Sequence, residues 1–229
     1  MKSKIQQIIE KTISIPKSYY VCFRLLPFKE AIKLPLLIRY NTKLRRLDGK
    51  INFINRTILC RMVEIGFEDV TIFDGRTDRC ILDISGTLNI AGKAIMGKGT
   101  RICIEPGATL SFGKDFYNSA GMKIICFNNI KFGNKCTVSW DTTIMDTDLH
   151  PTIDLKNNIV RSCNGSIIIG NNVWIAMRAT ILKDSQIPDG SIVACGAIAK
   201  NKFEETNILI ASSIATIKKR DIKIGRTRI

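Results

Sequence analysis

The sequence has little histidine and no long apolar run. Among its 229 residues there is one histidine, His150. A membrane-spanning helix needs roughly 18 to 20 uninterrupted apolar residues, whereas the apolar stretch AIKLPLLIRY is broken by Lys33, Pro35 and Arg39. The beginning of the chain, MKSKIQQIIEK, has charges where the core of a signal peptide would be apolar. We therefore expect a soluble, cytoplasmic protein.

Metal-binding spacings are missing as well. The chain has eight cysteines, but the closest two, Cys126 and Cys136, are ten residues apart and no C-x-x-C occurs. With a single histidine, the chain does not complete a Cys/His zinc set, so we expect no metal site. Most cysteines sit among aliphatic residues, as in KIICF, where a free thiol behaves as a small buried hydrophobe. We predict reduced structural thiols, in agreement with a reducing compartment.

The net charge of +15 is concentrated at the two ends of the chain. Residues 1–50 contain twelve Lys and Arg against three Asp and Glu, and residues 200–229 contain eight against three, which leaves +1 for the middle. A nucleic-acid-binding protein would carry its basic residues along one working surface, so we expect no nucleic-acid partner. The basic, partly apolar N-terminal segment favours either a peripheral contact with the anionic inner face of the cell membrane or a solvated cap.

The middle of the chain repeats every six residues. From residue 169 it reads IGNNVW, IAMRAT, ILKDSQ, IPDGSI and VACGAI, with an aliphatic residue first and a small or β-branched residue four later. A helix would need apolar spacings of three and four, and a simple strand would alternate by two over a short run. Five consecutive hexads instead favour an all-β solenoid of short strands, in which three strands close a triangular coil of about eighteen residues.

Corners and boundaries follow from the same register. Asn171-Asn172 and Asp189-Gly190 supply turn-forming residues for the corners. We predict coils over about residues 75–200, inside a β-helix domain of residues 51–203. A basic segment, helical or irregular, precedes this domain over residues 1–50, and a basic C-terminal cap follows it over residues 204–229.

The six-residue count stops once. After Ile144 the next clear hexad begins at Ile169, 25 residues later, so about nineteen residues are extra. We predict that this insertion, within a loop of about residues 145–168, leaves the coil. It contains His150, and imidazole is the side chain best suited to removing a proton near neutral pH.

Two stretches carry a family resemblance. The stretch IIIGNNVWIAMRATILKDSQIPDGSIVACGAIAKN resembles the hexapeptide-repeat acyltransferases of the maltose, galactoside and capsular-polysaccharide O-acetyltransferase type. The loop IMDTDLHP resembles their active-site loop, and His150 stands 24 residues before Trp174, a spacing typical of those enzymes. The resemblance implies a left-handed parallel β-helix, a homotrimer with active sites between neighbouring coils, and transfer of acetyl from acetyl-CoA to a sugar hydroxyl.

The resemblance also implies roles for residues. His150 would be the general base for a sugar hydroxyl, oriented by Asp148 or Asp146 or by Asp141 one strand earlier, of which we favour Asp148. The positions that assist the histidine in the family fall here on Ala120, Asn128 and Ser162, a departure from the pattern. The acetyl-CoA groove would use Trp174, Ala176, Met177, Ala194, Cys195, Gly196 and Lys200.

Three functions remain open on the sequence. The first is O-acetylation of a sugar or lipid-linked saccharide in the biosynthesis of a capsule, O-antigen or exopolysaccharide. The second is N-acetylation of an amino nucleotide-sugar or a small amine, which the same base and donor would support. The third is a non-enzymatic β-helix scaffold that docks a partner or a membrane through its basic ends.

Overall fold

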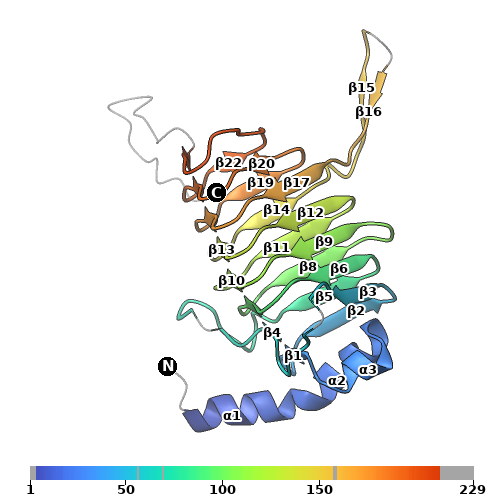
Figure 1. Ribbon diagram of the computed structural model, residues 1–229. Coiled ribbons are helices and arrows are strands. Elements are labelled where there is room, and N and C mark those ends of the chain that lie inside the picture. Colours follow the sequence, from blue (N-terminus) through green and yellow to red (C-terminus); the bar gives the residue numbers. More distant parts are fainter. Residues whose placement is uncertain (1–3, 56, 69, 157–158, 212–229) are drawn as a thin grey trace, which may run out of the picture.

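The computed structural model describes residues 4–55, 57–68, 70–156 and 159–211. The chain begins with three helices, α1 (Lys4–Ile13), α2 (Ile15–Leu25) and α3 (Phe28–Ala31), and then winds through strands. None of the described helices is long and apolar enough to cross a membrane. Successive strands pass through three parallel sheets in turn, so the body of the molecule is a parallel β-helix (Figure 1). The fold predicted from the hexads is confirmed.

Three sheets form the sides of the coil. Sheet A contains β1 (Leu36–Ile38), β4 (Val63–Ile65), β7 (Ala94–Met96), β10 (Phe116–Asn118), β13 (Thr137–Val138), β18 (Trp174–Ile175), β21 (Ile192–Val193) and β23 (Leu209–Ile210). Sheet B contains β2 (Lys43–Leu47), β5 (Ile81–Ile84), β8 (Arg101–Ile104), β11 (Lys123–Cys126), β14 (Thr143–Met145), β19 (Thr180–Leu182) and β22 (Ile198–Ala199). Sheet C contains β3 (Lys50–Phe53), β6 (Thr87–Ile90), β9 (Thr109–Phe112), β12 (Asn129–Phe132), β17 (Ser166–Ile169) and β20 (Gln186–Ile187). We call the connections between them the AB, BC and CA corners.

The core is a stack of like residues in register. Ile144, Ile181 and Ala199 pair directly from coil to coil in sheet B, and all three are buried. Near the CA corner the core widens to hold Phe112, Phe116 and Phe132, whose ring centroids lie 4.3 to 5.2 Å apart. Burial of such columns supplies most of the stabilisation, because each aliphatic or aromatic side chain removed from water contributes about 1.5 to 3 kcal/mol.

The corners rely on left-handed backbone conformations. At the CA corner φ is positive at Asp115, Lys135, Asn172, Gly190 and Asn207, with values of 54 to 69°. Side-chain hydrogen bonds also repeat at this corner, since the Asn134 N–H donates to Asn171 Oδ1 and the Asn171 N–H donates to Asp189 Oδ1, both at 2.8 Å. The corner role predicted for Asn171-Asn172 and Asp189-Gly190 is confirmed.

The coil begins earlier than the hexads suggested. Strands β1, β2 and β3 already form a complete first coil at residues 36–53, inside the segment that we predicted as helical or irregular. Long connections at residues 54–62 and 66–80 break the six-residue spacing there, which hides these strands in the sequence. At the other end β23 extends sheet A to Ile210. Most of the predicted C-terminal cap, from residue 212, lies outside the described residues.

Helix α2 closes the N-terminal end of the coil. Its buried face consists of Ser18, Val21, Cys22 and Leu25, and it packs on β1. The Ser18 hydroxyl accepts a 2.8 Å hydrogen bond from the Ile38 backbone N–H, which ties the helix to the first strand. The apolar core is therefore covered where the stack of coils begins.

Candidate active site

The predicted insertion leaves the coil at the BC corner. Between β14 and β17 the chain forms an antiparallel hairpin of β15 (Thr152–Asp154) and β16 (Ile159–Arg161). The hairpin stands out from the coil in Figure 1. Its base is closed by backbone hydrogen bonds of 2.8 Å from Asp148 N–H to the Cys163 carbonyl and from Gly165 N–H to the Asp146 carbonyl. The loop that contains His150 is thus anchored at both ends.

Asp146 anchors this loop to the coil below. Its side chain is buried, and its two carboxylate oxygens accept hydrogen bonds from the backbone N–H groups of Phe127 at 2.7 Å and Asn128 at 2.9 Å. The Cys126 thiol lies 3.7 Å from Oδ2. Burial, and then the negative charge of Asp146, raise the pKa of that thiol. Asp146 therefore fixes the backbone of the BC corner, and its carboxylate is bonded to the coil below and not to His150, the partner that we expected.

Asp148 is held by a lysine from the next coil. Its carboxylate lies 2.6 Å from Lys183 Nζ, and the same ammonium donates to the Ser162 carbonyl at 2.9 Å. Lys183 thus bridges the two sides of the hairpin at its base. The lysine directly follows β19, whose Ile181 is in register with Ile144 of β14, so it occupies the BC corner one coil beyond the loop's departure.

His150 is exposed at the start of the hairpin. The preceding residue, Leu149, has φ of +64°, and its N–H donates to Thr147 Oγ1 at 3.0 Å. Thr147 in turn donates to Asn164 Oδ1 at 2.7 Å across the loop. Among the described residues no side chain is hydrogen-bonded to the His150 ring, so the expected contact with Asp148 or Asp146 is not formed. The ring is open to an incoming hydroxyl.

Six of the seven residues predicted to bind acetyl-CoA gather at the AB corner. Trp174 lies in β18, with Ala176 and Met177 just after it, and Ala194, Cys195 and Gly196 follow β21 in the next coil. Asp141 lies at the same corner one coil below, with φ of +58°, and is therefore separated from His150.

The backbone of the AB corner repeats from coil to coil. The Gly196 N–H donates to the Met177 carbonyl, and the Arg178 N–H donates to the Trp140 carbonyl, both at 3.0 Å. Gly196 has φ of +68°, and a Cβ there would meet nothing within 4 Å. The corner therefore has the same turn in successive coils and is open at Gly196.

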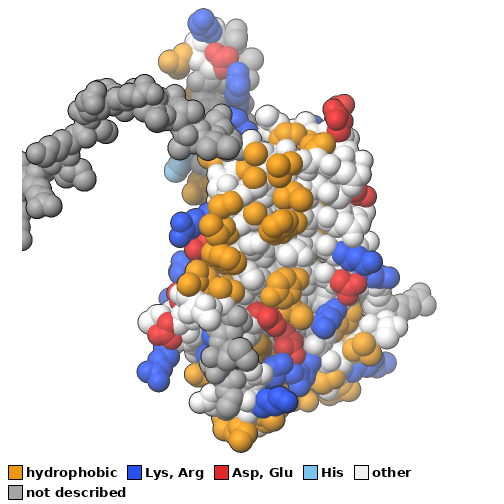
Figure 2. All heavy atoms as spheres, turned by 90° about the vertical axis from the view of Figure 1, so that its left-hand side faces the viewer, with side chains coloured by type: hydrophobic (Ala, Val, Ile, Leu, Met, Phe, Trp, Pro, Cys, Tyr) orange, Lys and Arg blue, Asp and Glu red, His pale blue; other side chains and the backbone are white. Residues whose placement is uncertain are grey.

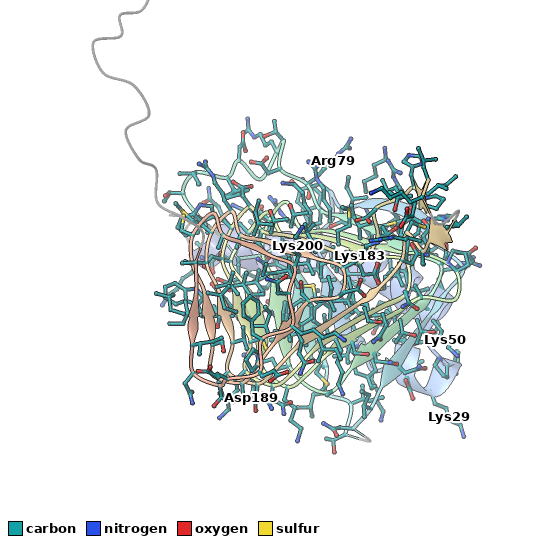
Figure 3. All side chains as sticks on the ribbon, turned by 90° about the horizontal axis from the view of Figure 1, so that it is seen from above. Lys29, Lys50, Arg79, Lys183, Asp189 and Lys200 are labelled. Carbon is teal, nitrogen blue, oxygen red and sulfur yellow. The ribbon has the colours of Figure 1, made fainter. Side chains whose placement is uncertain are left out.

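Lys200 lies elsewhere. Gly196 precedes strand β22 and Lys200 follows it, so Lys200 belongs to the BC corner. Seen along the coil, Lys200 and Lys183 lie along one side, and Asp189 marks a different corner (Figure 3). The predicted base and Lys200 are thus at one corner, and the remaining acetyl-CoA residues are at another.

Sequence reasoning missed the residues that support the loop. The base of the loop is held by Lys183, Thr147 and Asn164. Lys183 could have been placed beside the insertion only by aligning β14 with β19 of the next coil. Within the described ranges, no group of three or more His, Cys, Asp or Glu side chains is arranged to hold a metal ion.

Comparisons with known proteins give one curated relative of note. Over 104 residues the chain is 32% identical to a polysialic acid O-acetyltransferase of Neisseria meningitidis. The match spans 45% of this chain and 39% of the length of that relative. No family model matches the sequence.

Two solved structures align with most of the chain at low similarity. The polysialic acid O-acetyltransferase OatWY aligns over 85% of this chain and 88% of its own, with 21% identity and a TM-score of 0.39. The polySia-specific acetyltransferase NeuO aligns over 84% of this chain and 79% of its own, with 19% identity and a TM-score of 0.38. TM-scores this low do not support a function for this chain.

Proposed function

We propose that this protein transfers an acetyl group from acetyl-CoA to a hydroxyl of a sugar in polysaccharide biosynthesis, with a capsule, O-antigen or exopolysaccharide precursor as the acceptor. The observation that carries the proposal is His150, the sole histidine of the chain, exposed on a loop whose base is fixed by Asp146 and Lys183. The sequence match to a sugar O-acetyltransferase supports the same reaction.

The proposed chemistry is direct transfer. A ring nitrogen of His150 takes the proton from the acceptor hydroxyl as its oxygen attacks the thioester carbonyl of acetyl-CoA. The C–S bond then breaks, the acetyl group remains on the sugar oxygen as an ester, and the departing CoA thiolate takes the proton from the imidazolium. In this proposal Asp148 acts as a positioning residue through Lys183, and Asp146 fixes the corner beneath the loop.

For the acetyl-CoA itself we propose the AB corner. Ala176, Ala194 and Gly196 carry little side-chain bulk, and a Cβ at Gly196 would meet nothing within 4 Å, so the pantetheine arm would lie along this corner. The Trp174 indole, 47% exposed, donates to Ser139 Oγ at 3.1 Å and presents an apolar face beside this line. Lys200 at the BC corner would then meet a phosphate of acetyl-CoA bound to a neighbouring subunit.

We also propose that the protein is a homotrimer. Within one chain His150 lies at the BC corner and the proposed acetyl-CoA residues lie at the AB corner, so we infer that one subunit's loop meets the next subunit's AB corner. Such a head-to-tail contact closes into a ring of three when the rotation between neighbours is a third of a turn. Sheet A carries exposed Trp174, Ile192 and Leu209 in register, and Figure 2 shows apolar side chains gathered in a band on that side.

A cytoplasmic location is part of the proposal. All eight cysteines are unpaired, and four of them, Cys22, Cys80, Cys126 and Cys136, are buried. Burial raises the pKa of Cys80 to about 11, which keeps this thiol protonated and unreactive. Free thiols in this number favour a reducing compartment, where acetyl-CoA is also available.

The direct test is the His150→Ala variant. Because the side chain is exposed and makes no described hydrogen bond, we expect its thermal unfolding to match the wild type while acetyl transfer falls at least about 10²-fold. Release of CoA thiol, followed with panels of hydroxyl and amino acceptors, measures this and separates O- from N-acetylation. Near wild-type turnover by His150→Ala would exclude the mechanism.

A further inference from the structure

Helix α1 is attached to the protein by its charged side. Lys11 Nζ lies 2.8 Å from Glu64 of β4, and Glu10 lies 2.8 Å from Arg39, whose guanidinium is almost fully buried. No residue of α1 is buried, and Ile5, Ile8, Ile9 and Ile13 are each at least half exposed. A helix on a protein surface normally packs its apolar face inward. In α1 the ion pairs join the helix to the coil, while the four isoleucines remain at least half exposed.

The next two helices continue this apolar surface. α2 covers the core with one face, but Tyr20 and Phe23 on its other face are about half exposed, and Phe28 of α3 is 70% exposed. The rings of Phe23 and Phe28 lie 5.8 Å apart, centroid to centroid, and Ile32 beside them is half exposed. We call residues 4–33 the N-terminal cap. It lies at the N-terminal end of the stack of coils (Figure 1), whereas the proposed contacts between subunits involve the sides of the stack.

Basic residues surround these apolar side chains. Lys4, Arg24, Lys29 and Lys33 are exposed, and Lys29 points away from the body of the molecule in Figure 3. The cap contains two carboxylates, Glu10 and Glu30, and Glu10 is engaged by Arg39. The surface therefore combines aromatic and aliphatic groups with an excess of positive charge.

An apolar groove runs between α1 and the first coils. It has a volume of about 280 Å³ and includes Ile8, Ile15, Leu34 and Leu37 among its lining residues. Lys11 and Arg61 also line it, and both are paired with Glu64 at 2.8 Å. The groove therefore adds apolar surface to the cap, while the excess positive charge comes from the exposed basic residues outside it.

We propose that the N-terminal cap docks the protein on an anionic membrane surface, with its aromatic and isoleucine side chains in the interfacial region and its lysines on the headgroups. Aromatic and aliphatic residues combined with Lys and Arg are typical of interfacial helices, and cationic residues are attracted by anionic lipids. A second copy of the cap is disfavoured as the occupant, because a symmetric contact would bring these same basic groups face to face. The proposal goes beyond the acetyl transfer and does not depend on it.

Flotation of the full-length protein with lipid vesicles tests the proposal. We expect the wild type to float with vesicles that contain phosphatidylglycerol, and to stay at the bottom with pure phosphatidylcholine. High salt should weaken the binding, because the attraction to headgroups is screened. The double variant Phe23→Ser/Phe28→Ser should bind at least about tenfold more weakly, since it removes two aromatic rings from the apolar surface that would enter the membrane. The double variant Lys29→Glu/Lys33→Glu should bind anionic vesicles more weakly by a similar factor.

Matched controls lie far from the cap. Leu155→Ser removes an apolar side chain that is 91% exposed on the hairpin, and Lys131→Glu reverses an exposed charge on sheet C. Both should float like the wild type. The proposal is overturned if the wild type does not bind anionic vesicles, or if the cap variants bind as well as the controls. It is equally overturned if the cap variants change the mass of the oligomer but not vesicle binding, because the surface would then be a protein interface.

Discussion

The AB and BC corners of the coil differ in regularity. From the third coil onward the AB corner turns in the same way, with positive φ at Gly99, Gly121, Asp141, Arg178 and Gly196. At the BC corner the chain leaves the coil for twenty residues between Met145 and Ser166 and needs side chains to hold it. A repeated turn places equivalent backbone groups in a row along the coil. The inserted loop instead presents one side chain, His150, that has no equivalent in the other coils.

This difference explains how the two corners divide the proposed reaction. Regular backbone suits a long, amide-bearing donor, and small residues are enough to let it approach. Proton transfer needs a single group in a fixed place, and the loop provides it by anchoring the residues on either side of His150. The carboxylates Asp146 and Asp148, two positions apart, act on different parts of that anchor.

The largest predicted effect separates these two carboxylates. Asp146→Ala removes a buried acceptor from two backbone N–H groups, so we expect the free energy of unfolding to fall by about 3 kcal/mol. Asp148→Ala removes an ion pair whose carboxylate is about half exposed, so we expect a loss below about 1 kcal/mol. Urea denaturation of the two variants makes the comparison. Equal stabilities would mean that Asp146 does not anchor the BC corner.

A smaller effect sharpens the role of the AB corner. Cys195 at that corner and Cys60 before β4 are both exposed and free. Acetyl-CoA at ten times its Kd should slow maleimide labelling of Cys195 about tenfold, since only the unliganded fraction reacts. Labelling of Cys60 should keep its rate and serves as the internal control. If both thiols keep their rates, acetyl-CoA binds away from the AB corner.

Much of this architecture could be predicted from the sequence, because a coil imposes its period on every residue that points inward. Ile169, Ile175, Ile181 and Ile187 follow the six-residue count, and the break after Ile144 marks the loop at the correct corner. The first coil was missed because its connections have irregular lengths. Residues 43–47, KLRRL, also read as a charged segment, although Leu47 is buried.

The relative placement of site residues was harder to predict. Lys200 follows Gly196 by only four positions, yet one short strand carries the chain from the AB to the BC corner. Asp146 was predicted as a partner of His150 because the two are close in sequence. The strand direction instead turns its carboxylate toward Phe127 and Asn128 of the coil below. Hexad counting predicts where a residue lies along its own coil. It does not predict which side chains of neighbouring coils are in contact.

The central claim is that one active site combines the BC corner of one subunit with the AB corner of another. Its most direct test mixes two variants, His150→Ala and Cys195→Trp, where the second fills the proposed acetyl-CoA line. Each alone should have little activity. Co-expressed chains, isolated as mixed trimers through two different tags, should recover roughly a third of wild-type transfer, because one of the three neighbour pairs in every mixed trimer joins two intact corners. If verified mixed oligomers stay as inactive as their parents, both corners of a working site must come from the same chain, and the claim is wrong.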